Sequence, residues 1–127
     1  MPADINFLAA WIGILLGLVS GVIPGLLFHS EKWMGGYGSW SRRLTRLGHI
    51  SFFGIGFLNL SFALTVKVLG IEGGLLLPSM LFIAGAITMP AVCYLSAWRD
   101  AFRHLFFIPA LSATFGIGIF LWRILFP

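Results

Sequence analysis

Residues 12–29, IGILLGLVSGVIPGLLFH, carry a small residue at every fourth position and end on a histidine. The repeated residues are Gly13, Gly17, Gly21 and Gly25, followed by His29. In a helix, residues four apart follow the groove between side-chain ridges, and glycines there let a backbone or a flat ring come close. The stretch therefore predicts a membrane helix whose glycine row is a contact surface and does not face lipid.

The whole chain is far more apolar than a soluble domain of the same length. Of its 127 residues, 59% are hydrophobic and only 9% are charged, whereas soluble domains carry about 25% charged residues. A fold of this size cannot hide so much apolar surface, so the excess must face lipid or other subunits. Its length fits one domain covering residues 1–127.

Four segments are long and apolar enough to cross the hydrocarbon core, which takes about 20 helical residues. They are residues 6–29, 47–70, 75–97 and 104–126, each with approximate ends. The connections at 70–74 and 98–103 are short, so consecutive helices should be antiparallel neighbours. The sequence thus predicts an all-α integral membrane fold, a four-transmembrane-helix up-down bundle.

The connection at 30–46 is longer and has two parts. Gly35, Gly36 and Gly38 predict a turn. After it, Ser39 or Ser41 can cap an amphipathic lead-in to the second span.

The basic residues are distributed unevenly between the two ends of the predicted bundle. One end holds Lys32, Arg42, Arg43, Arg46, Arg99 and Arg103. The other end holds only Lys67 and Arg123, which can snorkel toward headgroups. Because cytoplasmic loops are enriched in Lys and Arg, both termini are expected on the non-cytoplasmic side, in a bacterial inner membrane. The net charge of +4 is explained by this orientation, and nucleic acid is not an expected partner.

Several kinds of catalytic site are missing from the sequence. There is no Ser-His-Asp arrangement, no phosphate-binding loop and no acidic residue inside a predicted span. The last absence argues against a proton-driven transporter. The chain is therefore not expected to be catalytic alone.

All three histidines fall near the predicted cytoplasmic end of the bundle, as His29, His49 and His104. The face through His49 carries Gly56 and other small residues, so this histidine is expected to point inward. His104 shares a face with Gly116. Interfacial histidines also contact water, headgroups or carbonyls without any ligand, and this simpler interpretation stays open.

One hypothesis is that His49 and His104 are the axial ligands of one b-type haem, since proteins commonly hold haem iron with histidine. Glycines would make room for the porphyrin, and arginines would pair with its propionates. The residues expected around this haem, besides the two ligands, are His29, Gly21, Gly25, Gly56, Gly116, Arg42, Arg43, Arg46 and Arg103.

Two alternatives remain. The three histidines could bind one metal ion with Glu31 or Asp100, or the chain could be a purely structural packing subunit. The leading interpretation is that the chain is a small integral subunit of a larger membrane complex for electron transfer. This subunit either holds a haem of its own near the cytoplasmic face or has none. Its expected partners are the lipid bilayer, other membrane subunits and a quinone.

Overall fold

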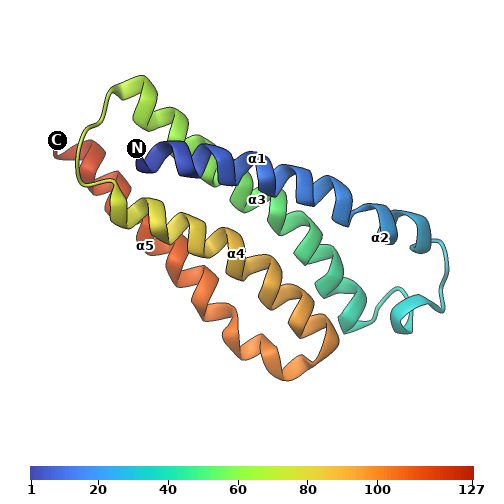
Figure 1. Ribbon diagram of the computed structural model, residues 1–127. Helices are drawn as coiled ribbons and strands as arrows, with labels where there is room; N and C mark the ends of the chain where they lie inside the picture. Colours follow the sequence, from blue (N-terminus) through green and yellow to red (C-terminus); the bar gives the residue numbers. More distant parts are fainter.

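The computed structural model describes all residues from 1 to 127, and every regular element in it is a helix (Figure 1). The elements are α1 (Pro2–Ser20), α2 (Val22–Leu27), the 3₁₀ turn η1 (Trp33–Gly35), α3 (Trp40–Leu69), α4 (Leu76–Trp98), the 3₁₀ turn η2 (Asp100–Phe106) and α5 (Phe107–Leu125). Four helical segments are long and apolar enough to cross a membrane. The predictions of an all-helical chain and of four span-length helices are therefore confirmed.

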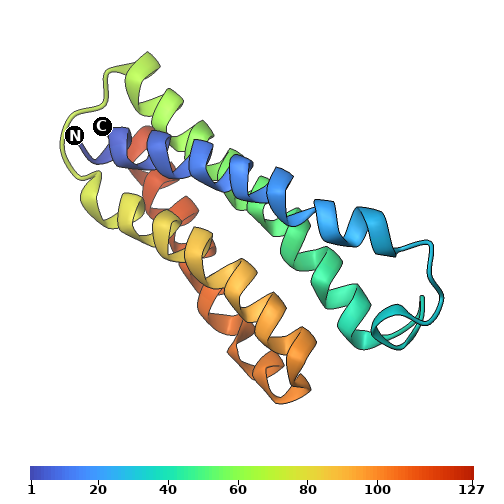
Figure 2. The same cartoon turned by 45° about the vertical axis from the view of Figure 1, so that its right-hand side comes forward.

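The long helices lie side by side in chain order. α1 packs along α3, α3 along α4, and α4 along α5, with a smaller contact between α1 and α4. Consecutive long helices run in opposite directions, and both chain termini lie at one end of the molecule (Figures 1 and 2). The middle pair is α3 and α4, which α1 and α5 flank.

The first predicted span, residues 6–29, is divided into α1 and α2 by a break at Gly21. Pro24 causes this break because it lacks the N–H that would bond to the carbonyl of Ser20 in a continuous helix. The bend between α1 and α2 is visible in Figure 1. The helix also begins earlier than predicted, at Pro2, because proline is well suited to the first helical position.

The second predicted span, residues 47–70, is the C-terminal part of a longer helix. The predicted lead-in joins it without a break, so that α3 begins at Trp40 with Ser39 as its N-cap. The Ser39 hydroxyl accepts a hydrogen bond of 3.2 Å from the backbone N–H of Arg42. At the other end, Gly70 is left-handed (φ +59°), and Ile71 N–H bonds to the Val66 carbonyl as in a Schellman motif.

The last two spans differ from the prediction in smaller ways. α4, residues Leu76–Trp98, is shifted by one residue from the predicted span 75–97 and continues as a helix through Pro90. The fourth span does not start as an α-helix at residue 104, because residues 100–106 form η2 and α5 starts at Phe107.

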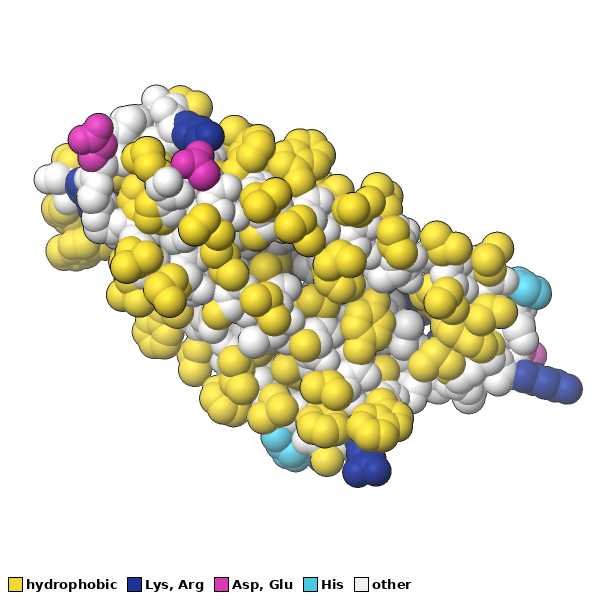
Figure 3. All heavy atoms as spheres, in the orientation of Figure 1, with side chains coloured by type: hydrophobic (Ala, Val, Ile, Leu, Met, Phe, Trp, Pro, Cys, Tyr) yellow, Lys and Arg dark blue, Asp and Glu magenta, His cyan; other side chains and the backbone are white.

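Aromatic side chains form the centre of the core near the termini. Phe62 on α3 lies between Phe82 of α4 and Phe120 of α5, with ring centroids 5.1 and 4.7 Å away. Outside this core, apolar side chains cover the visible face along the helices, and charged and histidine side chains lie toward the ends (Figure 3).

Candidate functional site

His49 lies on α3 where this helix crosses α1, and its side chain is half-buried. Its Nδ1 lies 3.2 Å from the Ser20 hydroxyl oxygen. That hydroxyl donates its hydrogen to the Gly17 carbonyl, 3.1 Å away. A serine hydroxyl has one hydrogen, so when it bonds to the Gly17 carbonyl, the Ser20 oxygen can accept a hydrogen bond from Nδ1 of His49 in the tautomer that carries a proton there.

Two further neighbours fix the His49 ring. Phe53, one turn along α3, meets it edge-on with centroids 5.4 Å apart. Gly21 lies against its edge, so that a Cβ at position 21 would come 2.5 Å from Cε1 of the ring. The ring is therefore held between α1 and α3 by a hydrogen bond, an aromatic contact and a backbone contact.

The glycine row of α1 follows the same crossing. A Cβ at Gly13 would lie 3.4 Å from the Phe52 carbonyl oxygen, and one at Gly17 would lie 2.8 Å from the Phe53 ring. The prediction of a contact surface is confirmed for Gly13, Gly17 and Gly21, which pack against α3. Gly25 makes no such contact within this chain, since it is exposed and has no neighbour within 4 Å of a built Cβ.

The other glycines expected around a haem also have close protein neighbours. A Cβ at Gly56 would meet the Ala10 carbonyl oxygen at 3.4 Å, and one at Gly116 would meet the Phe82 ring at 2.9 Å. With Gly21 against His49, three of the four expected glycines therefore serve helix packing. Of these four glycines, only Gly25 has open space beside it.

The other two histidines lie elsewhere. His104 is exposed in η2, a segment that packs mainly against α4, and it forms no side-chain hydrogen bond. His29 is exposed, and its Nδ1 lies 2.8 Å from the Leu26 carbonyl oxygen. His49 and His104 thus have neighbours on different helices. No group of three or more His, Cys, Asp and Glu side chains is placed to hold a metal ion.

Arg42 is buried, with 1% of its surface exposed. Its guanidinium donates to the carbonyls of Ser30 at 2.9 Å and Phe28 at 2.5 Å. It also lies 4.4 Å from the centre of the Tyr37 ring, with the Phe28 and Trp33 rings at 5.0 and 5.4 Å. Arg42 therefore fixes the connection between α2 and α3 and does not present its donors outward.

The remaining arginines of the expected propionate site are on the surface. Arg43 and Arg46 are exposed and form no ion pair, while Arg103 pairs with Asp100 at 3.3 Å. These three side chains are open to a ligand outside the protein.

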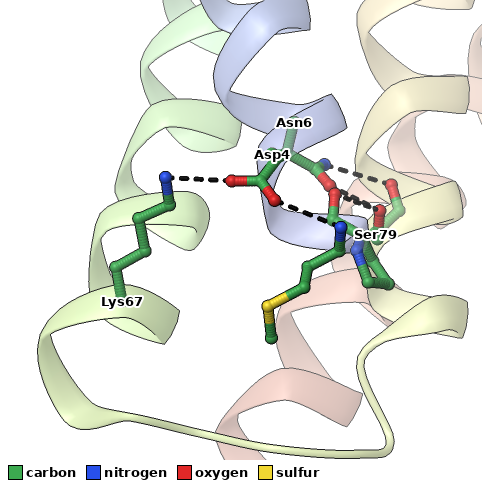
Figure 4. A network of polar contacts seen from close by, with 6 residues as sticks. Asp4, Asn6, Lys67 and Ser79 are labelled. Carbon is green, nitrogen blue, oxygen red and sulfur yellow. Dashed lines mark hydrogen bonds and ion pairs between the residues drawn. The ribbon is translucent and has the colours of Figure 1, made fainter.

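A buried polar network that the sequence reasoning missed joins three helices. Asn6 donates to the side-chain oxygen of Asn59 at 2.7 Å and accepts from the Ser79 hydroxyl. Asn59 donates in turn to the Phe82 carbonyl at 3.1 Å. Figure 4 shows Asn6 pointing to Ser79. A signal was available, because Asn6 and Asn59 are the only asparagines of the chain and both lie in predicted spans.

An ion pair lies beside this network (Figure 4). Lys67, expected to snorkel toward headgroups, places its Nζ 2.9 Å from the Asp4 carboxylate, which also meets the N-terminal amine at 3.1 Å. Arg123 donates to the Glu72 carbonyl at 2.9 Å. Both cations near the termini therefore have partners within the chain.

Comparisons of this chain with protein-family models, curated proteins and solved structures found no match.

Proposed function

We propose that the chain is an integral membrane protein with an antiparallel, up-down arrangement of four spans that serves as a small subunit of a larger membrane complex. The observation that carries this proposal is the apolar surface of the flanking helices. Large apolar side chains are exposed along the whole length of α1 and α5, for example Leu8, Leu15, Leu111, Phe115 and Leu125. Exposing so much apolar surface to water would be unfavourable, whereas lipid or apolar partner helices can cover it.

The charges support an orientation with both termini on the non-cytoplasmic side. The end that carries the α2–α3 connection and η2 holds six Lys and Arg residues against two acids, Glu31 and Asp100. The end that carries the termini holds Lys67 and Arg123 against Asp4 and Glu72. Six of the eight Lys and Arg residues therefore lie at one end, and the positive-inside rule assigns such an end to the cytoplasm.

A row on the outer face of α5 supports contact with a partner helix. Ala110, Thr114 and Gly118 are exposed and spaced by four, and a Cβ at Gly118 would meet nothing within 4 Å. Glycine in a helix is about 1 kcal/mol less favourable than alanine. Small residues compensate for this cost where another helix comes close.

Reporter fusions and purification test this proposal. Fusions after Pro127 and in the loop at Gly36–Gly38 should report opposite sides of the membrane, and equal signals would contradict the arrangement. Purification in mild detergent should retain at least one further membrane protein in fixed proportion. A chain that purifies alone, without partners, would contradict the subunit role.

Haem binding is a second candidate function, and the orientation of His49 favours it. Metal-ligating histidines usually donate a hydrogen bond from their other ring nitrogen, which fixes the tautomer. Ser20 stands in that relation to Nδ1 of His49 in the tautomer that carries a proton there, and Nε2 would then be the nitrogen that could bind iron. A chain that held haem in this way would serve electron transfer.

A visible spectrum tests the second candidate independently. Protein purified from haem-supplied cells should show a Soret band that His49→Ala removes and that Ser20→Ala shifts. His104→Ala would show whether a second histidine takes part. Absence of the band from the wild-type protein would reject haem binding and leave the subunit proposal intact.

A further inference from the structure

The outward face of α3 presents a continuous exposed strip that begins with two arginines. Its members are Arg43, Arg46, Leu47, Ile50, Gly54 and Phe57, which follow one another at three or four residues except for the adjacent pair Arg46 and Leu47. The three large apolar side chains, Leu47, Ile50 and Phe57, are 40%, 53% and 54% exposed. A Cβ at Gly54 would meet nothing within 4 Å, so the surface beside this residue is open. We refer to these six residues as the α3 strip.

The two arginines at the top of the α3 strip have no anionic partner. Neither forms an ion pair or a side-chain hydrogen bond, although the Arg46 guanidinium lies 5.7 Å from the centre of the Phe28 ring. Residues three apart on a helix are neighbours on one face. Arg43 and Arg46 can therefore both donate to one phosphate, the anion that guanidinium groups recognise well.

The α3 strip is long enough to line one leaflet. At 1.5 Å per residue, the helix rises about 16 Å from Arg46 to Phe57. This distance is close to half of the roughly 30 Å hydrocarbon core. With the arginines among the headgroups, the strip would line the cytoplasmic half of the bilayer, and the exposed face of α3 continues beyond it through Leu64 and Val68.

Resting on the membrane insertion proposed above, we propose that the α3 strip binds one acidic phospholipid of the cytoplasmic leaflet. The phosphate lies between Arg43 and Arg46, and an acyl chain runs over Leu47 and Ile50 and past the open surface at Gly54. Only the end of the strip that carries Arg43 and Arg46 has a charge complementary to an anionic headgroup. Basic sites on the cytoplasmic side of membrane helices select acidic lipid headgroups in this way.

The shape of the α3 strip favours a lipid over a partner helix. Its apolar part carries the bulky side chains of Leu47, Ile50 and Phe57, which hold a neighbouring backbone at a distance. The outer face of α5 carries small residues instead, as helix contacts prefer. A flexible acyl chain can follow the uneven surface of the strip.

The experiment compares two charge-matched double variants in nanodiscs of phosphatidylcholine containing phosphatidylglycerol. Arg43→Gln/Arg46→Gln removes both cations of the α3 strip. Lys32→Gln/Arg99→Gln removes two exposed cations from the same end of the molecule but not from the strip. Native mass spectrometry or a spin-labelled phosphatidylglycerol counts the lipid retained. The wild type should prefer phosphatidylglycerol over phosphatidylcholine by about thirty-fold, from two arginines near the surface.

The strip variant should lose most of this preference, and the control variant should keep most of it. Gly54→Trp, which places a bulky side chain across the path of the acyl chain without changing charge, should weaken retention of either lipid. Equal losses in the two double variants, or no preference in the wild type, would overturn the proposal. So would the finding that a copurifying protein, and not lipid, is released by the strip variant.

Failure of this inference is distinguishable from failure of the proposed membrane function. If the wild-type chain is extracted from membranes without detergent, the proposed function fails. If it needs detergent and shows no preference for phosphatidylglycerol, only the lipid site fails.

Discussion

The Cα of Gly21 lies against the imidazole of His49, so closely that a methyl group at position 21 would come 2.5 Å from Cε1 of the ring. This contact joins the break between α1 and α2 to the N-terminal half of α3. The contact also explains why position 21 is a glycine. Any larger residue there would displace the His49 ring, which Ser20 and Phe53 hold from other sides.

Gly21→Ala should therefore destabilise the protein by about 1–3 kcal/mol, the usual cost of overpacking a filled site. Thermal unfolding in detergent measures the effect. Gly25→Ala is the matched control, because it lies one turn away with open space around its Cβ, and it should be neutral or gain up to about 1 kcal/mol of helix propensity.

Combining Gly21→Ala with His49→Ala should restore part of the loss, because the second change removes the ring that the new methyl group strikes. The coupling in this double-mutant cycle should be about 0.5–3 kcal/mol. Strict additivity of the two single effects would show that the packing of this pair is not the cause.

Asn59→Ala should cost about 1–2 kcal/mol of stability, because Asn6 loses its acceptor and the Phe82 carbonyl loses a donor. Ser61→Ala is the control on the same helix, since Ser61 is exposed and forms no side-chain hydrogen bond. Melting curves of the two variants in one detergent give the comparison. Equal stabilities would mean that the buried network contributes nothing measurable.

Arg42→Lys should loosen the connection between α2 and α3 while the long helices stay folded. A lysine keeps the charge but cannot donate to the carbonyls of Ser30 and Phe28 with a planar group. Limited trypsin digestion at Lys32 should become several-fold faster. Arg43→Lys, at an exposed neighbour, should leave the rate unchanged, and equal rates in both variants would assign Arg42 no role in ordering the loop.

Gly118→Leu should leave the fold intact but release the partner subunit, because its side chain projects from the outer face of α5 into space that is empty in the single chain. Gly116→Leu, two residues earlier, should unfold the protein, since Phe82 already fills that position. Melting and copurification are measured together. If a folded Gly118→Leu protein still retained the partner, the outer face of α5 would not be the contact face.

Local chemistry was sufficient to predict much of the architecture. The apolar length of each segment predicted the four span-length helices, and Ser39, which caps α3, was one of the two predicted caps. These features depend on neighbours in the chain, through hydrogen bonds within a few residues and through the summed hydropathy of a segment.

Only the tertiary structure decided which polar residues meet. The sequence placed three histidines near one end and favoured an inward direction for His49, but it could not name their partners, and folding directs His49 toward Ser20 while leaving His104 exposed. Folding likewise pairs Asn6 with Asn59 across 53 positions and surrounds Arg42 with rings from the connection just before α3. Helical periodicity predicts on which face of its own helix a side chain lies. Which residue of a neighbouring helix meets that side chain depends on how the two helices rotate and cross.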